Sequence, residues 1–129
     1  MRIACIIAIA ALLSTAVSAQ VTVERYSNGS KRAEGKLVDG QREGTWYEFN
    51  LKGIKIAEAN YVNGVKEGKY TEWHPNGKKM FEGAFKAGKL NSMVTSYRAD
   101  GSIEEKGRFT DDLRDSVWMF YHPNGTVGS

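Results

Sequence analysis

The chain has 129 residues, one cysteine and a formal net charge of +3 at pH 7. Its 18 basic and 15 acidic residues are intermixed, so it lacks the clustered positive charge that neutralises nucleic-acid phosphates. We therefore expect a chain of one domain that does not bind nucleic acid.

The N-terminal segment, residues 1–19, has the features of a cleaved signal peptide. Arg2 precedes an apolar run over residues 3–13, and small residues stand at 17–19. That run is too short to span the roughly 30 Å of a membrane's hydrocarbon core, which disfavours the alternative of a retained anchor. We expect cleavage after Ala19, which leaves residues 20–129 as an exported domain in the periplasm or outside the cell. Cys5 would be lost, so no disulfide or thiolate metal site could form.

The rest of the chain repeats with a fixed period, which equals the step from Gly29 to Gly53. One series of glycines keeps this step at Gly29, Gly53, Gly77, Gly101 and Gly125. A second series comprises Gly40, Gly64 and Gly88, followed by Asp112. A fixed period without insertions indicates tandem copies of one structural unit. We place the repeats at 21–44, 45–68, 69–92 and 93–116, with a partial copy at 117–129.

Each unit is expected to contain strand, turn, strand and a loop bracketed by glycines. The segment from His74 to Gly77 has the chemistry of a three-residue hairpin loop, since Pro75 presets φ and Gly77 accepts the left-handed conformation. The second loop is expected over residues 40–44 and their equivalents. Asp112 replaces a glycine there, so we expect the last of these loops to be strained or reshaped.

Large and small residues recur in columns that predict how the sheet forms a core. One strand of each unit contributes Trp46, Tyr70, Val94 and Trp118, and the other contributes Leu37, Tyr61, Phe85 and Phe109. Small residues stand two positions before the latter, at Gly35, Ala59, Gly83 and Gly107. Strand alternation puts them on the same face, where a ring from the next strand can lie over them. The predicted fold is all-β: an elongated, single-layer antiparallel β-meander of about nine strands.

A second aromatic column is the strongest candidate for a binding site. It consists of Phe49, Trp73, Tyr97 and Tyr121. Alternation places these rings on the face opposite Trp46, where partly exposed rings would form a strip for binding or dimerisation. The alternative is that strand bending brings both columns into one thin core, and the sequence does not separate the two.

Two other columns and a pair of histidines carry side chains that could serve in catalysis or metal binding. Glu34, Glu58 and Glu82 repeat at the same step, but neighbouring repeats lie roughly 10 Å apart, which is marginal for paired carboxylate catalysis. Lys31, Lys55 and Lys79 stand three residues earlier, and strict alternation would place them on the other face. His74 and His122 fall in equivalent turns about 20 Å apart, too far to share an ion. We expect no catalytic residue, metal or cofactor.

The spacing of these residues resembles the MORN repeat in its bacterial variant form. In the third copy the matching positions are Asn76-Gly77, Lys79, Glu82-Gly83, Phe85 and Gly88, and the resemblance extends over residues 26–125. Similar bacterial proteins are often labelled as antitoxin components of toxin–antitoxin pairs. We expect a non-enzymatic interaction module, because an open sheet leaves unpaired strand edges that need a protein partner or a second copy of the chain. The resemblance implies an antitoxin-like or immunity-like role. The alternative is an envelope protein whose aromatic strip binds glycans or lipid headgroups.

Overall fold

The computed structural model describes residues 20–128, so the expected signal peptide and its cleavage site lie outside the described residues. Ten antiparallel strands form one sheet, with no helix in the described part of the chain. The strands are β1 (Gln20–Arg25), β2 (Lys31–Val38), β3 (Gln41–Phe49), β4 (Lys55–Val62), β5 (Val65–Trp73), β6 (Lys79–Lys86), β7 (Lys89–Leu90), β8 (Ser92–Tyr97), β9 (Ile103–Thr110) and β10 (Leu113–Phe120).

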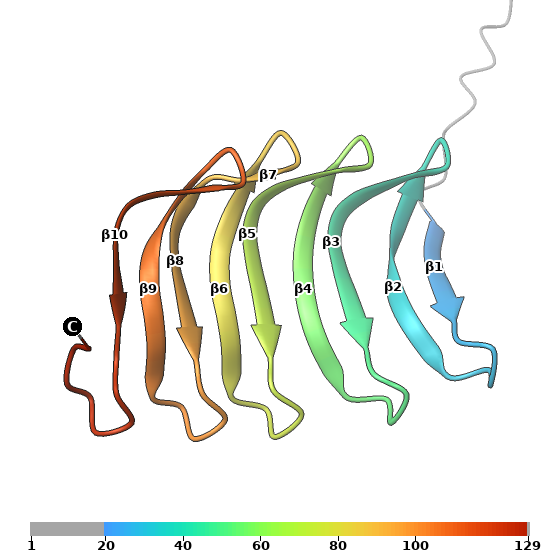
Figure 1. Ribbon diagram of the computed structural model, residues 1–129. Helices are drawn as coiled ribbons and strands as arrows, with labels where there is room; N and C mark the ends of the chain where they lie inside the picture. Colours follow the sequence, from blue (N-terminus) through green and yellow to red (C-terminus); the bar gives the residue numbers. More distant parts are fainter. Residues whose placement is uncertain (1–19, 129) are drawn as a thin grey trace, which may run out of the picture.

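The strands follow one another across the sheet in chain order, which confirms the predicted single-layer meander (Figure 1). The short β7 pairs with β6 beside this path. One row of turns lies along each side of the sheet, and β1 and β10 are its two edges (Figure 1). No helix within residues 20–128 is long and apolar enough to cross a membrane.

The turns that join β1 to β2, β3 to β4, β5 to β6 and β8 to β9 lie in the lower row of Figure 1. Their hydrogen bonds have the predicted three-residue geometry. In the third copy, the Gly77 N–H donates to the His74 carbonyl at 2.9 Å, and the His74 N–H donates to the Lys78 carbonyl at 2.8 Å. Gly77 has a φ of 85°, in the left-handed region that favours glycine. The Asn76 carboxamide accepts from the Lys78 N–H at 3.0 Å, which fixes the turn further.

The predicted loop over residues 40–44 is wrong. Asp39 and Gly40 both have positive φ, at 50° and 76°, and they form a two-residue turn between β2 and β3. Residues 41–43 already belong to β3. Gly44 then takes a φ of 70° inside β3. The ribbon of β3 bends after the turn (Figure 1). The glycine pair therefore marks a tight turn and a bend rather than the two ends of a loop.

The strand count is ten rather than about nine because the third copy is interrupted. Ser92 stands where earlier copies have Gly44 and Gly68, and it does not take their positive φ. Its hydroxyl instead accepts from the Ala84 N–H at 2.8 Å, in place of a backbone carbonyl. The register shifts here as it does between β4 and β5, but the strand is also broken at Asn91, so β7 and β8 are separate strands. In the fourth copy, Ser116 keeps the bend with a φ of 66°.

The core lies on one face of the sheet, which we call the core face; it carries Trp46, Tyr61, Tyr70, Phe85 and Trp118. Its most buried large side chain is Trp46, which is 1% exposed. A Cβ built on Gly35 would overlap the Trp46 ring, and one on Gly107 would overlap the Trp118 ring. The prediction that rings lie over glycines is thus confirmed.

Candidate functional site

The face opposite the core carries a repeated pair of lysine and glutamate, and we call it the Lys–Glu face. The ammonium-to-carboxylate distances are 2.6 Å for Lys31–Glu34, 3.6 Å for Lys55–Glu58 and 2.8 Å for Lys79–Glu82. The expectation that these side chains would lie on opposite faces is wrong. In the second copy, Phe49 is opposite Lys55 and Glu48 is opposite Ala57, so Ile56 is an extra residue in β4. This β-bulge shifts the alternation by one residue and turns Lys55 toward Glu58.

The predicted aromatic column lies on the Lys–Glu face rather than in the core. Phe49 alternates with Trp46 and Glu48 along β3, and its ring faces the Lys31 ammonium at 5.1 Å from the ring centre. The Trp73 ring has the Lys55 ammonium above it at 4.5 Å. All four rings of the column are half-buried: Phe49, Trp73, Tyr97 and Tyr121. Of the two arrangements that the sequence left open, the structure has the one with rings on both faces.

Tyr97 differs from Phe49 and Trp73 because it contacts the acidic member of a pair. Its hydroxyl donates to the Glu82 carboxylate at 2.6 Å, while Lys79 donates to the same carboxylate at 2.8 Å. The hydrogen bonds from Lys79 and Tyr97 lower the pKa of Glu82, against a smaller opposing effect of burial. Glu82 is thus held as a carboxylate between a cation and a ring.

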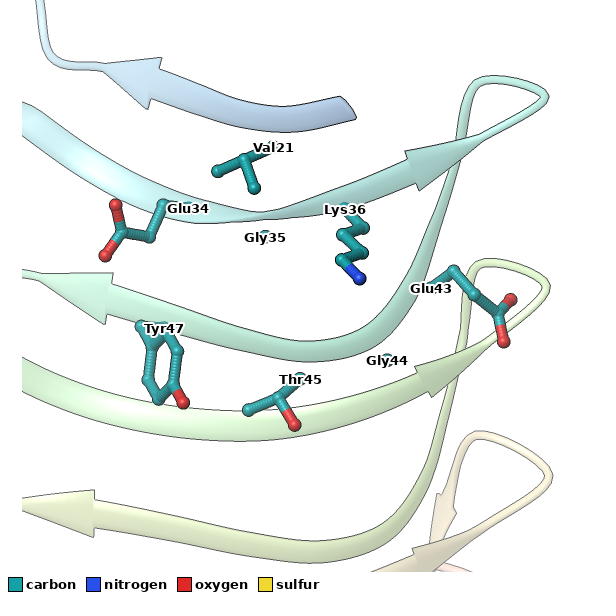
Figure 2. Close-up of a pocket in the computed structure, with 8 residues that line it drawn as sticks. All are labelled: Val21, Glu34, Gly35, Lys36, Glu43, Gly44, Thr45 and Tyr47. Atoms are coloured by element: carbon teal, nitrogen blue, oxygen red, sulfur yellow. The ribbon is translucent and has the colours of Figure 1, made fainter. Parts of the chain in front are cut away.

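Two shallow hollows interrupt the Lys–Glu face at equivalent places. One has a volume of about 490 Å³ and is bordered by Glu34, Lys36 and Tyr47, with Gly35 and Gly44 at its floor (Figure 2). The other hollow, of about 540 Å³, lies two repeats further on around Gly83. Rings and ion pairs therefore recur along this face, with hollows at two equivalent places.

Basic side chains cover the aromatic rings on the core face. The Arg42 guanidinium lies 4.1 Å from the Trp46 ring centre, and the Arg114 guanidinium lies 3.9 Å from that of Trp118. Lys66, at the same repeat position, lies 4.7 Å from the Tyr70 ring centre. These basic residues stand at equivalent positions of the repeat, which is the sequence signal that points to them.

The first residue of each three-residue turn can hydrogen-bond to the next repeat. Tyr26, His74 and Arg98 occupy this position. The Tyr26 hydroxyl donates to the Phe49 carbonyl at 2.8 Å. His74 Nε2 lies 2.8 Å from the Tyr97 carbonyl oxygen, and Arg98 donates to the Tyr121 carbonyl. His74 therefore serves as a hydrogen-bonding turn residue. Among residues 20–128, no three His, Cys, Asp or Glu side chains gather in a way that could hold a metal ion.

Two further hollows, on the core face, lie one repeat apart near the three-residue turns. The first has a volume of about 370 Å³, and Glu24, Arg32 and Arg42 are among its lining residues. The second, of about 360 Å³, is bordered by Glu48 and Glu72 together with Trp73. Trp73 stands at the end of β5, where it contacts Lys55 on the Lys–Glu face and also borders this hollow.

The fold and its recurring surface define a β-repeat protein built from hairpin units. Residues 66–87 match the family described as the MORN repeat variant. The matched segment spans most of β5, the following turn and β6, which is close to one structural unit. A search of curated proteins found no match. The family match supports a MORN repeat protein, and this kind of repeat indicates a protein for binding or interaction.

Proposed function

We propose that the chain is a non-enzymatic, exported interaction module that binds a protein partner through its Lys–Glu face. The observation that carries this proposal is the half-buried column of Phe49, Trp73, Tyr97 and Tyr121, interleaved with Lys–Glu pairs. Aromatic residues are enriched at protein interfaces and dominate binding energies there, whereas ion pairs at the rim favour the correct partner.

The arrangement of the lysines favours a protein over a glycan as the ligand. Sugars bind aromatic side chains by stacking on the open ring face. The ammonium groups of Lys31 and Lys55 already lie over Phe49 and Trp73, so a sugar would have to displace them. A protein partner can instead add carboxylates or carbonyl groups to these lysines and contact the ring edges.

The bacterial variant form and the antitoxin-like role come from the resemblance of the repeat and belong to this proposal. Export would separate the chain from a cytosolic toxin. We therefore favour an immunity-like role, in which the module neutralises a toxin that acts in the cell envelope. Expression of the full chain, followed by N-terminal sequencing of the exported product, tests the first step. The proposal predicts that the product begins at Gln20, and an uncleaved chain retained in the cytosol would contradict it.

Affinity capture from an envelope fraction, with protein purified after expression of the full chain, tests the partner. The proposal predicts one dominant protein whose binding weakens at least tenfold with Trp73→Ala. Leu113→Ala is the matched control, because Leu113 is 72% exposed and lies in β10, outside the aromatic column. Equal binding of the two variants, or tryptophan fluorescence that responds to cell-wall sugars or anionic lipid with no captured protein, would contradict the proposal.

A further inference from the structure

The two hollows of the core face are copies of one another, but they differ in charge. Advancing by one repeat replaces Glu24 by Glu48 and Glu48 by Glu72, so each hollow has two carboxylates. The same step replaces Arg32 by Ile56. The structure therefore contains one site twice, with and without its arginine.

In the first hollow the carboxylates are neutralised from within the chain. Arg32 donates to Glu24 at 2.9 Å, and Arg42 donates to the same carboxylate at 3.0 Å. Arg42 also lies 3.8 Å from Glu48. Burial alone would raise the pKa of Glu24, but the hydrogen bonds from the two guanidinium groups lower it below its ordinary value. Two carboxylates and two guanidinium groups thus balance in charge.

No cation is among the described residues that line the second hollow. Glu48 borders both hollows and keeps its contact with Arg42, so Glu72 is the carboxylate whose counterpart cation is missing. Ile56 provides an apolar wall where the first hollow has a guanidinium. Lys66, the equivalent of Arg42, places its ammonium over the rings of Tyr70 and Phe85, at 4.7 and 5.0 Å. Within residues 20–128, Glu72 forms no ion pair, and its side chain accepts a hydrogen bond from the Tyr70 hydroxyl.

The remaining lining of the second hollow suits a guanidinium group with an aliphatic stem. Its walls include Trp73, Tyr70 and Met80, besides the two carboxylates. A guanidinium can bond a carboxylate through two N–H groups and also stack on an aromatic ring, and its methylene stem packs on apolar surface. Burial, followed by the hydrogen bond to Glu72, raises the pKa of Tyr70, so its hydroxyl stays a neutral donor.

We propose that the hollow bordered by Glu48, Glu72 and Trp73 binds the guanidinium group of an arginine side chain from a protein partner. The external arginine occupies the place that Arg32 fills in the preceding repeat. The source of the arginine rests on the proposed function, whereas the site itself does not. Trp73 connects the two surfaces, because it also lies in the aromatic column of the Lys–Glu face.

Titration of isotope-labelled protein with N-acetyl-L-arginine methylamide, followed by NMR, tests the site. We expect saturable shifts of the Trp73 indole and of the Glu72 and Met80 amides. The citrulline analogue, which is neutral and nearly the same shape, should bind at least tenfold more weakly, and the lysine analogue more weakly than arginine. Equal binding of citrulline would show that the hollow selects no charge, and equal binding of lysine would overturn the guanidinium assignment.

Ile56→Arg gives the sharpest variant, because it restores the residue that the chain itself uses one repeat earlier. It should abolish binding of the arginine probe while the protein stays folded. Val62→Arg is the matched control: it adds the same charge at the other end of β4, where the side chain is 49% exposed. Glu72→Gln should weaken binding at least tenfold. Unchanged binding in folded Ile56→Arg protein would refute the site.

The two proposals fail separately. If the probe binds as expected but no partner protein is captured, the site stands and the proposed function fails. If a partner is captured and binds Ile56→Arg protein as well as the parent, the proposed function stands and that partner is not the source of the arginine.

Discussion

The first and last copies of the bent strand, β3 and β10, have the same backbone but different side-chain support. Trp46 in β3 is 1% exposed, and its indole N–H donates to the Lys36 carbonyl at 3.0 Å. Trp118, its equivalent in β10, is less buried, and its indole nitrogen has no hydrogen-bond partner among the described residues. Each ring has its own guanidinium above it, that of Arg42 over Trp46 and that of Arg114 over Trp118. The packing of a guanidinium on the tryptophan ring is thus the same in both copies, whereas the hydrogen bond of the indole N–H is present only in the first.

The two strands have the same backbone conformation but build it from different residues. The bend is made by Gly44 in β3, with a φ of 70°, and by Ser116 in β10, with a φ of 66°. In the turn before each strand, Asp112 takes a φ of 68° where the first copy has Gly40, whereas Asp39 and Asp111 are alike. A left-handed conformation costs a residue with a side chain about 1 kcal/mol or more relative to glycine. The comparison teaches that the bend can persist without glycine, as at Ser116, although the serine at the equivalent position 92 does not adopt it.

Truncation of the two tryptophans should have the largest effect. Trp46→Ala is expected to lower the free energy of unfolding by about 3–5 kcal/mol, as for other buried large-to-small changes. Trp118→Ala should cost clearly less, since Trp118 is more exposed and lies in an edge strand. Urea unfolding measures both. Equal losses would break the comparison and place Trp118 in an equally well-packed core.

Replacement by phenylalanine separates the indole N–H from the ring. Trp46→Phe removes the hydrogen bond to the Lys36 carbonyl and should cost about 1–3 kcal/mol, which includes the unpaired carbonyl. Trp118→Phe removes a buried N–H without a partner among the described residues, so the loss should be much smaller or absent. Thermal and urea unfolding of the pair give the difference. A similar cost at both positions would show that Trp118 finds a partner in solution.

The bend residues offer a reciprocal exchange. Ser116→Gly should stabilise the protein by about 0.5–1 kcal/mol because glycine accepts the positive φ, and Gly44→Ser should destabilise it by a similar amount. Asp112→Gly is a useful contrast. The Asp112 carboxylate accepts from the Leu90 N–H at 2.6 Å, so glycine would lose a contact while it relieves strain. If Ser116→Gly were destabilising, strain at this bend would not explain the difference between the copies.

The smallest expected effect depends on pH. The folded-state pKa of Glu24 lies below its ordinary value, so its bonds to Arg32 and Arg42 stabilise the fold above the unfolded-state pKa. That stability is lost as the pH falls through the folded-state pKa. Glu24→Gln should therefore destabilise the protein at pH 7, and the difference from the parent should shrink between about pH 5 and pH 2. A difference that does not change with pH would mean that Glu24 acts through shape alone.

The sequence predicted the parts of the fold that depend on the period and on local turn chemistry. The constant step between equivalent glycines led to the hairpin unit, the turn after His74 and the rings over Gly35 and Gly107. Strict alternation failed at the bulge of Ile56, so the Lys55–Glu58 pair was missed. A bulge is set by how two strands pair, and a single strand's sequence does not reveal it.

The candidate site was predicted only in part, because the spacing of residues does not reveal how the strands pair. The column that includes Phe49 and Trp73 could be named from its spacing, but the face it occupies depended on the strand path. The hollow beside Glu72 was not predicted. It lacks a guanidinium because Ile56 stands at the repeat position that Arg32 occupies in the first hollow. Comparing unlike residues at equivalent repeat positions, rather than like ones, would have pointed to it.

The central claim is that equivalent strands share one backbone conformation but differ in local stability along the sheet. Hydrogen exchange of backbone amides under native conditions tests it most directly. The informative strands are β3 to β5 and β8 to β9, since both groups lie inside the sheet and edge fraying affects neither directly. The account predicts markedly slower exchange in β3 to β5, where Trp46 and Tyr61 are buried and the bend glycines are intact. Equal protection of the two groups would contradict it.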